Sequence, residues 1–186
     1  MRAPSVAVIL PCYNEEISIA QVIADFRAAL PDADIYVFDN ASDDRTAEVA
    51  AAAGAIVRSE PRRGKGHVVR RMFADVFGDV YVLADGDGTY HAASAPGMID
   101  RLTRDNLDMV LGVRKQVGRS DVYRPGHRFG NWLFSNAVAM LFGRKFTDIL
   151  SGYRVMSSRF VKSFPVVAQG FEIETEITVH CLDLYL

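Results

Sequence analysis

Two aspartates separated by one glycine could bind a divalent cation. Asp85 and Asp87 follow the apolar run from Val80 to Ala84, and alternation along an extended chain would turn both side chains to the same side. Carboxylates this close repel each other unless a cation lies between them or one is protonated. Mg²⁺ prefers oxygen ligands and commonly combines one or two carboxylates with substrate phosphates. The pair therefore indicates a metal–diphosphate site, while a plain turn rich in Asp and Gly is the competing interpretation.

The positions of the glycines exclude two common phosphate-binding loops. A dinucleotide-binding dehydrogenase needs G-x-G-x-x-G after its first strand, and no glycine occurs between Val6 and Asn40. The P-loop pattern G-x-x-x-x-G-K-[ST] is also missing, because Gly64-Lys65-Gly66 lacks both the earlier glycine and the hydroxyl residue. We therefore expect neither a dehydrogenase nor a P-loop enzyme.

Strands and helices alternate along the chain. Short, nearly continuous apolar runs typical of strands buried on both faces cover residues 5–10, 35–38, 55–57, 80–84 and 109–111. Between them, helical spacing predicts one helix from Ile19 to Leu30, ended by Pro31, and a second capped by Ser42 or Asp43 and continuing through Gly54. A third is expected from about Lys65 to Phe77. This order predicts an α/β domain with a parallel sheet and helices on both faces.

Polar residues follow each of the first predicted strands. The segments concerned are Pro11 to Glu16, Asp39 to Asp44 and Asp85 to Tyr90. In open sheets of this class, ligands bind beyond the carboxyl ends of the strands. We therefore expect these three loops to form one site.

Composition and charge narrow the possibilities further. The 186 residues, 49% of them hydrophobic, fit one folded domain over residues 1–186, and no apolar stretch reaches the roughly 20 residues of a membrane span. Cys12 and Cys181 lack metal-site spacing and are expected to be reduced thiols. The net charge of −2 conceals a segregation, because residues 1–100 carry −6, residues 101–162 carry +8 and residues 163–186 carry −4. Such a pattern suggests separate regions for cations and anions, or else ordinary solvated surface.

Several motifs recur together in a recognisable order. They are Pro11, Tyr13-Asn14-Glu15-Glu16, Asp39 with Ser42-x-x-Arg45-Thr46, Arg63-Gly64-Lys65-Gly66, Asp85-Gly86-Asp87, and Asp148 with Ser151-Gly152-Tyr153-Arg154. In order and spacing the chain resembles family 2 glycosyltransferases, and among them the polyprenyl- or dolichyl-phosphate sugar transferases. The resemblance implies the GT-A nucleotide-sugar-binding fold, with three layers and a mostly parallel central sheet. It also implies Mg²⁺ or Mn²⁺ as cofactor and inversion at the anomeric carbon.

The resemblance assigns the acidic half of the chain to a UDP- or GDP-linked sugar donor. It implies that Pro11, Tyr13, Glu15, Asp39 and Gly86 contact the nucleotide sugar, that Asp85 and Asp87 bind the metal, and that Asp87 is catalytic. Tyr13 would offer a flat face to the base. Lys65 is expected to add a second cation, or else to be solvated at the start of a helix. The glycines beside it fit close approach to a substrate or a tight turn.

The basic half is assigned to a lipid-phosphate acceptor. The implied acceptor residues are Arg114, Arg128, Ser151, Arg154 and Glu172, with Arg128 also counted as catalytic. Guanidinium groups suit bidentate phosphate recognition. Because a phosphomonoester is already a nucleophile at neutral pH, no strong general base is needed, and Asp148 would serve if the acceptor were a hydroxyl. No nucleic-acid partner is expected.

The uncharged segment from Phe129 to Gly143 leaves two interpretations open. It is either a core helix or a segment at an anionic membrane surface, since basic residues flank it. The resemblance places the enzyme in the cytoplasm, peripheral at the inner face of the membrane. A saccharide or glycolipid hydroxyl as acceptor, and a non-catalytic nucleotide-sugar-binding module, are the alternative functions. We expect the domain to lack the C-terminal part present in relatives, and Thr89 replaces a glutamine that many relatives use as a further metal ligand.

Overall fold

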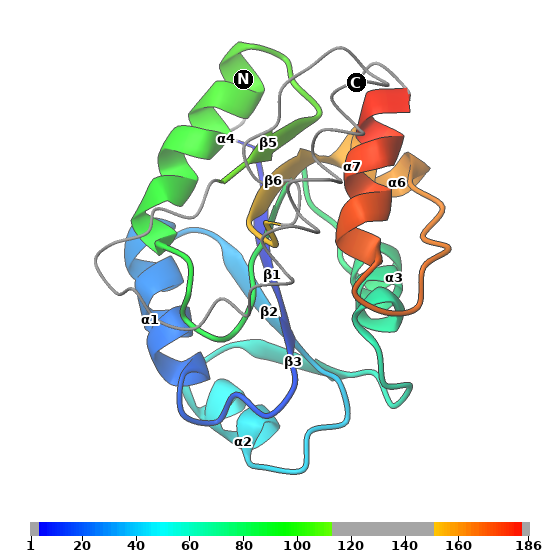
Figure 1. Cartoon of the computed structure of the whole chain (residues 1–186). Helices are drawn as coiled ribbons and strands as arrows, with labels where there is room; N and C mark the ends of the chain where they lie inside the picture. Colours follow the sequence, from blue (N-terminus) through cyan, green and yellow to red (C-terminus); the bar gives the residue numbers. More distant parts are fainter. Residues whose placement is uncertain (1–3, 113–150, 184–186) are drawn as a thin grey trace, which may run out of the picture.

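The computed structural model describes residues 4–112 and 151–183, and within them it contains one sheet of six strands. These are β1 (Val6–Cys12), β2 (Asp34–Asp39), β3 (Ile56–Ser59), β4 (Val80–Leu83), β5 (Met109–Leu111) and β6 (Arg154–Ser157). Their order across the sheet is β3-β2-β1-β4-β6-β5 (Figure 1). The first four strands run parallel, whereas β6 is antiparallel to both β4 and β5. The sheet is therefore mostly parallel, as the sequence predicts.

Helices cover both faces of this sheet and make three layers (Figure 1). One face carries α1 (Ile19–Ala29), α2 (Thr46–Ala52) and α4 (Ala95–Arg104), and the other carries α3 (Lys65–Asp75), α6 (Ser158–Ser163) and α7 (Ile173–Asp183). Along β1, Val8 packs in the core that contains Phe26, while its neighbour Ile9 packs in the core that contains Phe73. Burial on both faces is the reason that the strands are continuously apolar. In the described ranges, no helix is both long and apolar enough to cross a bilayer.

The observed helices match the prediction for α1 and correct it for the next two. The helix α2 begins at Thr46 rather than at Ser42 or Asp43, because those residues bond across to Asn14 in the loop after β1. The helix α3 ends at Asp75, two residues before Phe77.

The C-terminal half contributes elements that the sequence patterns did not predict. These are α4, β6, α6 and α7. Because β6 is antiparallel, its first residue, Arg154, lies opposite Leu83 at the end of β4. The turn from Ser151 to Tyr153 therefore reaches the carboxyl edge of the parallel strands. The apolar segment from Phe129 to Gly143 lies outside the described residues.

Candidate functional site

A pocket of about 660 Å³ lies at the carboxyl edge of β1, β2 and β4. Its lining combines residues of all three predicted loops with the start of α3 and the first turn of α7. The lining residues are Pro11, Cys12, Tyr13, Glu15, Asn40, Arg63, Gly64, Lys65, Val68, Asp85, Gly86, Asp87, Phe171 and Glu174. Most donor-side residues expected from the sequence thus share one cavity. The exception is Asp39, which lies beside it and is buried.

The loops after β1 and β2 are bonded to each other residue by residue. The backbone N–H of Asn14 donates to Ser42 Oγ at 3.0 Å, that of Glu15 donates to Thr46 Oγ1 at 2.7 Å, and that of Glu16 donates to Asp44 at 3.1 Å. The Asn14 backbone has a φ of 58°, a left-handed conformation that asparagine tolerates better than most residues. These contacts hold the Tyr13 and Glu15 side chains at the edge of the pocket.

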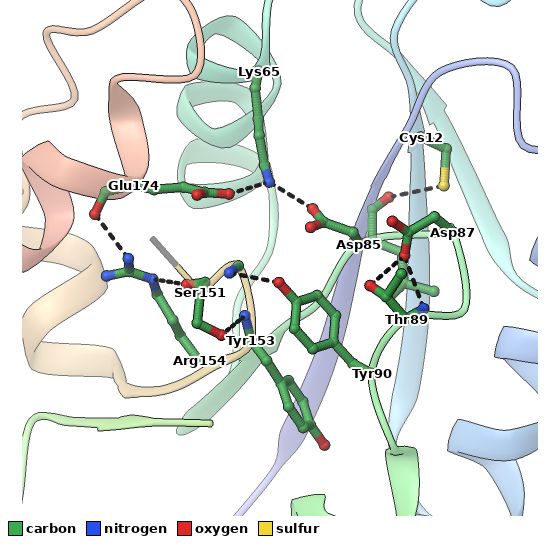
Figure 2. A network of polar contacts seen from close by, with 12 residues as sticks. Cys12, Lys65, Asp85, Asp87, Thr89, Tyr90, Ser151, Tyr153, Arg154 and Glu174 are labelled. Carbon is green, nitrogen blue, oxygen red and sulfur yellow. Dashed lines mark hydrogen bonds and ion pairs between the residues drawn. The ribbon is translucent and has the colours of Figure 1, made fainter. Parts of the chain in front are cut away.

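Asp85 and Asp87 line the same wall of the pocket but have different partners. Oδ1 of Asp85 accepts from the Lys65 ammonium at 2.5 Å, and a Cβ at Gly152 would lie 2.7 Å from Oδ2. Oδ1 of Asp87 accepts from the Thr89 N–H at 2.9 Å and from its hydroxyl at 2.7 Å (Figure 2). Thr89 is therefore occupied in fixing Asp87.

The acidic charge around this pair fits a hard cation. Four carboxylates line the pocket, from Glu15, Asp85, Asp87 and Glu174, against two basic side chains. Burial, together with the carboxylates of Asp87 and Asp85, raises the pKa of Glu15 above its ordinary value, although a hydrogen bond from Ser18 opposes this. The described residues contain no cluster of three or more His, Cys, Asp or Glu that could hold a metal ion. The arrangement suits Mg²⁺ or Mn²⁺ bound by two carboxylates and completed by substrate phosphates.

Lys65 reaches the site from the first turn of α3. Its side chain is only 10% exposed, so the interpretation of Lys65 as a solvated residue is wrong. Burial alone would lower the pKa of its amine, but the carboxylates of Asp85 and Glu174 outweigh burial and raise it. Gly64 and Gly66, which flank Lys65, allow another segment of the chain to pack closely against them. A Cβ at Gly64 would lie 2.4 Å from the Gln169 carbonyl oxygen, so the backbone that approaches it belongs to the segment before α7.

The aromatic residue Tyr13 also lines the pocket. Tyr13 is 43% exposed, and the guanidinium carbon of Arg63 lies 5.1 Å from the centre of its ring. Asp43 holds both, accepting from the Tyr13 hydroxyl at 3.2 Å and from Arg63 at 2.9 Å. At the end of β2, the buried Oδ1 of Asp39 has no hydrogen-bond partner among the residues that the structure describes. A buried carboxylate oxygen without a donor is costly and suggests a ligand that supplies one.

Two of the expected acceptor residues are buried, and others lie outside the described residues. Ser151 is buried and donates its hydroxyl to the Gly112 carbonyl at 2.6 Å. Arg154 is fully buried, and its guanidinium donates to the Ser151 carbonyl at 3.1 Å and to the Glu174 carbonyl at 2.8 Å (Figure 2). It also donates to Thr178 Oγ1 at 2.9 Å. Neither lines the pocket. Arg114, Arg128 and Asp148 lie outside the described residues.

Glu172, which the resemblance implies as an acceptor residue, does not line the pocket. It is exposed, and its carboxylate accepts from the backbone N–H groups of Gln169 at 3.2 Å and Gly170 at 2.9 Å. Glu174, two residues later, points into the pocket instead. The Glu172-x-Glu174-x-Glu176 pattern alternates as a strand would, but the last two residues lie in a helix, where positions two apart face different ways.

Sequence reasoning also missed several pocket residues. Asn40, which directly follows the predicted Asp39, is buried and bonds to the loop before α3 through Glu60, Arg62 and Gly64. Its position at a strand end was a signal that could have identified it. Phe171 and Glu174 lie on either side of the predicted Glu172, and the packing of β6 and α7 brings these two residues, rather than Glu172, to the pocket.

Comparison with known proteins agrees with this geometry. The chain matches the family model described as Glycosyl transferase family 2 over residues 7–164. It is 57% identical over 124 residues to Protein RfbJ of Shigella flexneri, a match that covers 67% of this chain and 96% of that protein. It is 40% identical over 178 residues to glycosyltransferase AglJ of Haloferax volcanii, covering 95% of this chain and 58% of AglJ. A dolichyl-phosphate hexose transferase of the same organism is 33% identical over 148 residues, covering 80% of this chain and 64% of that protein.

A solved structure shares the fold over nearly the whole chain. Glucosyl-3-phosphoglycerate synthase from Mycobacterium tuberculosis, in complex with Mn²⁺, uridine-diphosphate-glucose and phosphoglyceric acid, matches with a TM-score of 0.78 at 27% identity. The match covers 98% of this chain and 66% of the synthase chain, so this chain spans about two thirds of that protein and less of AglJ. The three-layer arrangement is the expected GT-A fold, and the chain belongs to glycosyl transferase family 2.

Proposed function

We propose that this chain is the catalytic domain of an inverting, metal-dependent glycosyltransferase that moves a sugar from a nucleotide-diphosphate sugar to a polyprenyl phosphate. The observation that carries the proposal is a single pocket that combines the ring of Tyr13 with the carboxylates of Asp85 and Asp87 and the ammonium group of Lys65. These groups suit a nucleotide base at one end and a metal-bound diphosphate at the other.

The nucleotide end of the proposed donor site is built by Tyr13, Pro11 and Asp39. The exposed face of an aromatic ring stacks on a base, and the partnerless Oδ1 of Asp39 can accept from a base N–H or a ribose hydroxyl. The synthase from M. tuberculosis, whose structure contains uridine-diphosphate-glucose, supports a UDP-linked donor here.

The diphosphate end is acidic and therefore needs a cation before an anion can enter. Asp85 and Asp87 would hold Mg²⁺ or Mn²⁺, which would stabilise the charge that develops on the departing nucleotide diphosphate. Glu15 and Gly86 complete this wall, since the Ser18 hydroxyl bonds both the Glu15 carboxylate at 2.9 Å and the Gly86 carbonyl at 2.8 Å. Lys65 adds a fixed positive charge.

The acceptor in this proposal is a lipid phosphate. A phosphate oxygen attacks the anomeric carbon on the side opposite the diphosphate, the bond from that carbon to the diphosphate oxygen breaks, and the configuration inverts. A phosphomonoester has a second pKa of about 6 and needs no strong general base. Similarity to a dolichyl-phosphate hexose transferase supports this acceptor. Phe171, 80% exposed at the pocket, offers an apolar surface for the lipid chain.

The proposed acceptor-binding residues come from the basic half of the chain. Arg114 and Arg128 would contact the phosphate directly, with Asp148 as the base for a hydroxyl acceptor. Ser151 and Arg154 are both buried and would support the acceptor site indirectly rather than contact the phosphate. The charge of +8 over residues 101–162 supports a peripheral position on the cytoplasmic face of an anionic membrane.

The proposal is tested by transfer assays with the purified chain. UDP- and GDP-linked hexoses are each incubated with undecaprenyl phosphate, dolichyl phosphate or a soluble saccharide, with Mn²⁺ or with chelator. We expect Mn²⁺-dependent transfer to the lipid phosphates only. Transfer only to the saccharide would contradict the acceptor, and calorimetric binding of the donor without transfer or donor hydrolysis would indicate a non-catalytic module.

Two variants test the metal site within the same assay. Asp85→Asn and Asp87→Asn should abolish Mn²⁺-dependent transfer, because each removes a proposed ligand. Asp100→Asn, an exposed change on α4, is the matched control and should behave as the wild type. Full activity in both site variants would refute the metal assignment.

A further inference from the structure

The ammonium group of Lys65 lies between two carboxylates from distant parts of the chain. Its Nζ is 2.5 Å from Asp85 Oδ1 and 2.5 Å from Glu174 Oε1, and all three side chains are largely buried (Figure 2). One positive charge therefore serves two negative ones. Asp85 follows β4 in the donor site, whereas Glu174 comes from the first turn of α7.

The fold fixes Glu174 independently of Lys65. Its backbone carbonyl accepts from the buried Arg154 guanidinium at 2.8 Å and from the Thr178 hydroxyl at 3.0 Å. The same first turn is tied to the preceding segment by Glu176, whose carboxylate accepts from the N–H groups of Val167 at 2.8 Å and Ala168 at 2.7 Å. The backbone of Glu174 is thus fixed by the fold, and its carboxylate lies beside a lysine on a flexible stem.

This arrangement bears on how Asp85 could serve two cations. In the proposed function Asp85 is a metal ligand, yet here it is paired with Lys65. A divalent ion on Asp85 would repel the neighbouring ammonium group and weaken its hold in the pocket. A second carboxylate within 2.5 Å gives the ammonium group a place to remain when the metal takes Asp85.

We propose that Glu174 is a positioning residue that retains Lys65 in the pocket while the metal occupies Asp85, so that the ammonium group stays available to the diphosphate. This inference rests on the proposed function. Without Glu174, Lys65 would pair with Asp85 alone and compete with the metal for it. With Glu174, the lysine and the metal can be bound together.

The test measures binding of Mn²⁺ alone, followed by binding of UDP at saturating Mn²⁺, by calorimetry on the full chain. Glu174→Gln should weaken Mn²⁺ binding about 10- to 100-fold, the usual range for residues that support metal ligands. Lys65→Met should leave Mn²⁺ binding at least as tight as in the wild type, because the competing cation is gone, but should weaken UDP binding. The double variant should recover the Mn²⁺ affinity that Glu174→Gln loses.

Controls separate positioning from folding. Glu174→Asp keeps the charge and should lie closer to the wild type than Glu174→Gln, and Glu48→Gln, on the exposed side of α2, should change neither affinity. A structural role for Glu174 alone predicts that the double variant binds Mn²⁺ no better than Glu174→Gln, and that result would overturn the inference. If the wild-type chain transfers sugar and Glu174→Gln binds Mn²⁺ as tightly as the wild type, only the inference is overturned. If the wild-type chain itself neither binds Mn²⁺ nor transfers sugar, the proposed function is overturned as well.

Discussion

Gly66 lies directly against the backbone of Ala168. A Cβ at Gly66 would come within 2.2 Å of the Ala168 carbonyl oxygen, and the Gly66 N–H donates to the Gln169 carbonyl at 3.0 Å. The first turn of α3 and the segment before α7 are thus in backbone contact. This contact places Lys65 and Phe171 on adjoining walls of the pocket.

Replacing Gly66 with alanine should therefore be destabilising. Backbone atoms cannot move aside as a flexible side chain can, and overpacking of this kind costs typically 1–3 kcal/mol. Urea unfolding of Gly66→Ala should show that loss. Gly97→Ala is the matched control, because nothing lies within 4 Å of its Cβ position in α4, and there alanine should stabilise by about 0.5–1 kcal/mol. Equal effects at the two sites would contradict the packing argument.

Asp108 joins the start of β5 to the end of β6 through a buried carboxylate. Oδ1 accepts from the Ser157 hydroxyl at 2.6 Å and from Arg159 Nε at 2.9 Å, and Oδ2 accepts from Arg159 Nη2. The hydrogen bonds from Arg159, helped by the one from Ser157 and opposed by burial, lower the pKa of Asp108. Asp108→Asn should reduce the free energy of unfolding by about 1–3 kcal/mol at pH 7, the usual cost of breaking such a bond to a buried group.

The pH dependence of this contribution follows from the sign of the shift. Because the folded-state pKa lies below the unfolded value of about 3.9, the stabilisation is complete above that value and is lost as the pH falls through the folded pKa. The difference between the wild type and Asp108→Asn in urea unfolding should therefore be constant from pH 7 to 5 and shrink below about pH 4. Asp100→Asn, which breaks an exposed pair with Arg104, should cost only about 0.3–0.5 kcal/mol. A difference that grows on acidification would contradict the assignment.

The side of the pocket formed by the loops after β1 and β4 could be predicted from the sequence because each of its parts is local. Tyr13, Glu15, Asp85 and Asp87 each follow an apolar run that forms a parallel strand. Parallel strands have their carboxyl ends at one edge, so recognising the strands is enough to bring these residues together. The apolar runs themselves were easy to identify, because both faces of the sheet are covered.

The α7 side could not be predicted in the same way. The strand β6 has only four residues and contains a fully buried arginine, Arg154, which no hydrophobic pattern indicates. Its antiparallel direction brings Gly152 against Asp85, and the guanidinium of Arg154 holds the backbone carbonyl of Glu174. The position of Glu174 thus depends on the tertiary contact between β6 and α7, which a local sequence pattern does not indicate.

Tyr13 should contribute to nucleotide affinity through its ring rather than its hydroxyl. The ring is held beside Arg63, and the hydroxyl donates to Asp43 at 3.2 Å. Tyr13→Ala should weaken UDP binding in the presence of Mn²⁺ by about 1–3 kcal/mol, the usual value of stacking on one base. Tyr13→Phe keeps the ring and should bind UDP almost as the wild type does. Calorimetry decides between them, and equal loss in both variants would assign the effect to the hydroxyl contact with Asp43 instead.

Cys12 lines the pocket and yet should be chemically inert. Cys12 is 2% exposed, and a Cβ at Gly86 would lie 2.5 Å from its sulfur, so the thiol is covered from the side of Gly86. Burial, followed by the carboxylates of Glu15, Asp39, Asp85 and Asp87, raises the pKa of the Cys12 thiol. Because the thiolate is the reactive form, iodoacetamide at pH 8 should leave Cys12 unmodified in the native chain. Mass spectrometry of the peptide that contains Cys12 measures this, with the chain unfolded in guanidinium chloride as the control that labels fully.

Addition of Mn²⁺ should not make the Cys12 thiol reactive, because a cation offsets the carboxylates but leaves the burial unchanged. Rapid labelling of the native chain would mean that solvent reaches the sulfur and that the wall formed by Gly86 opens.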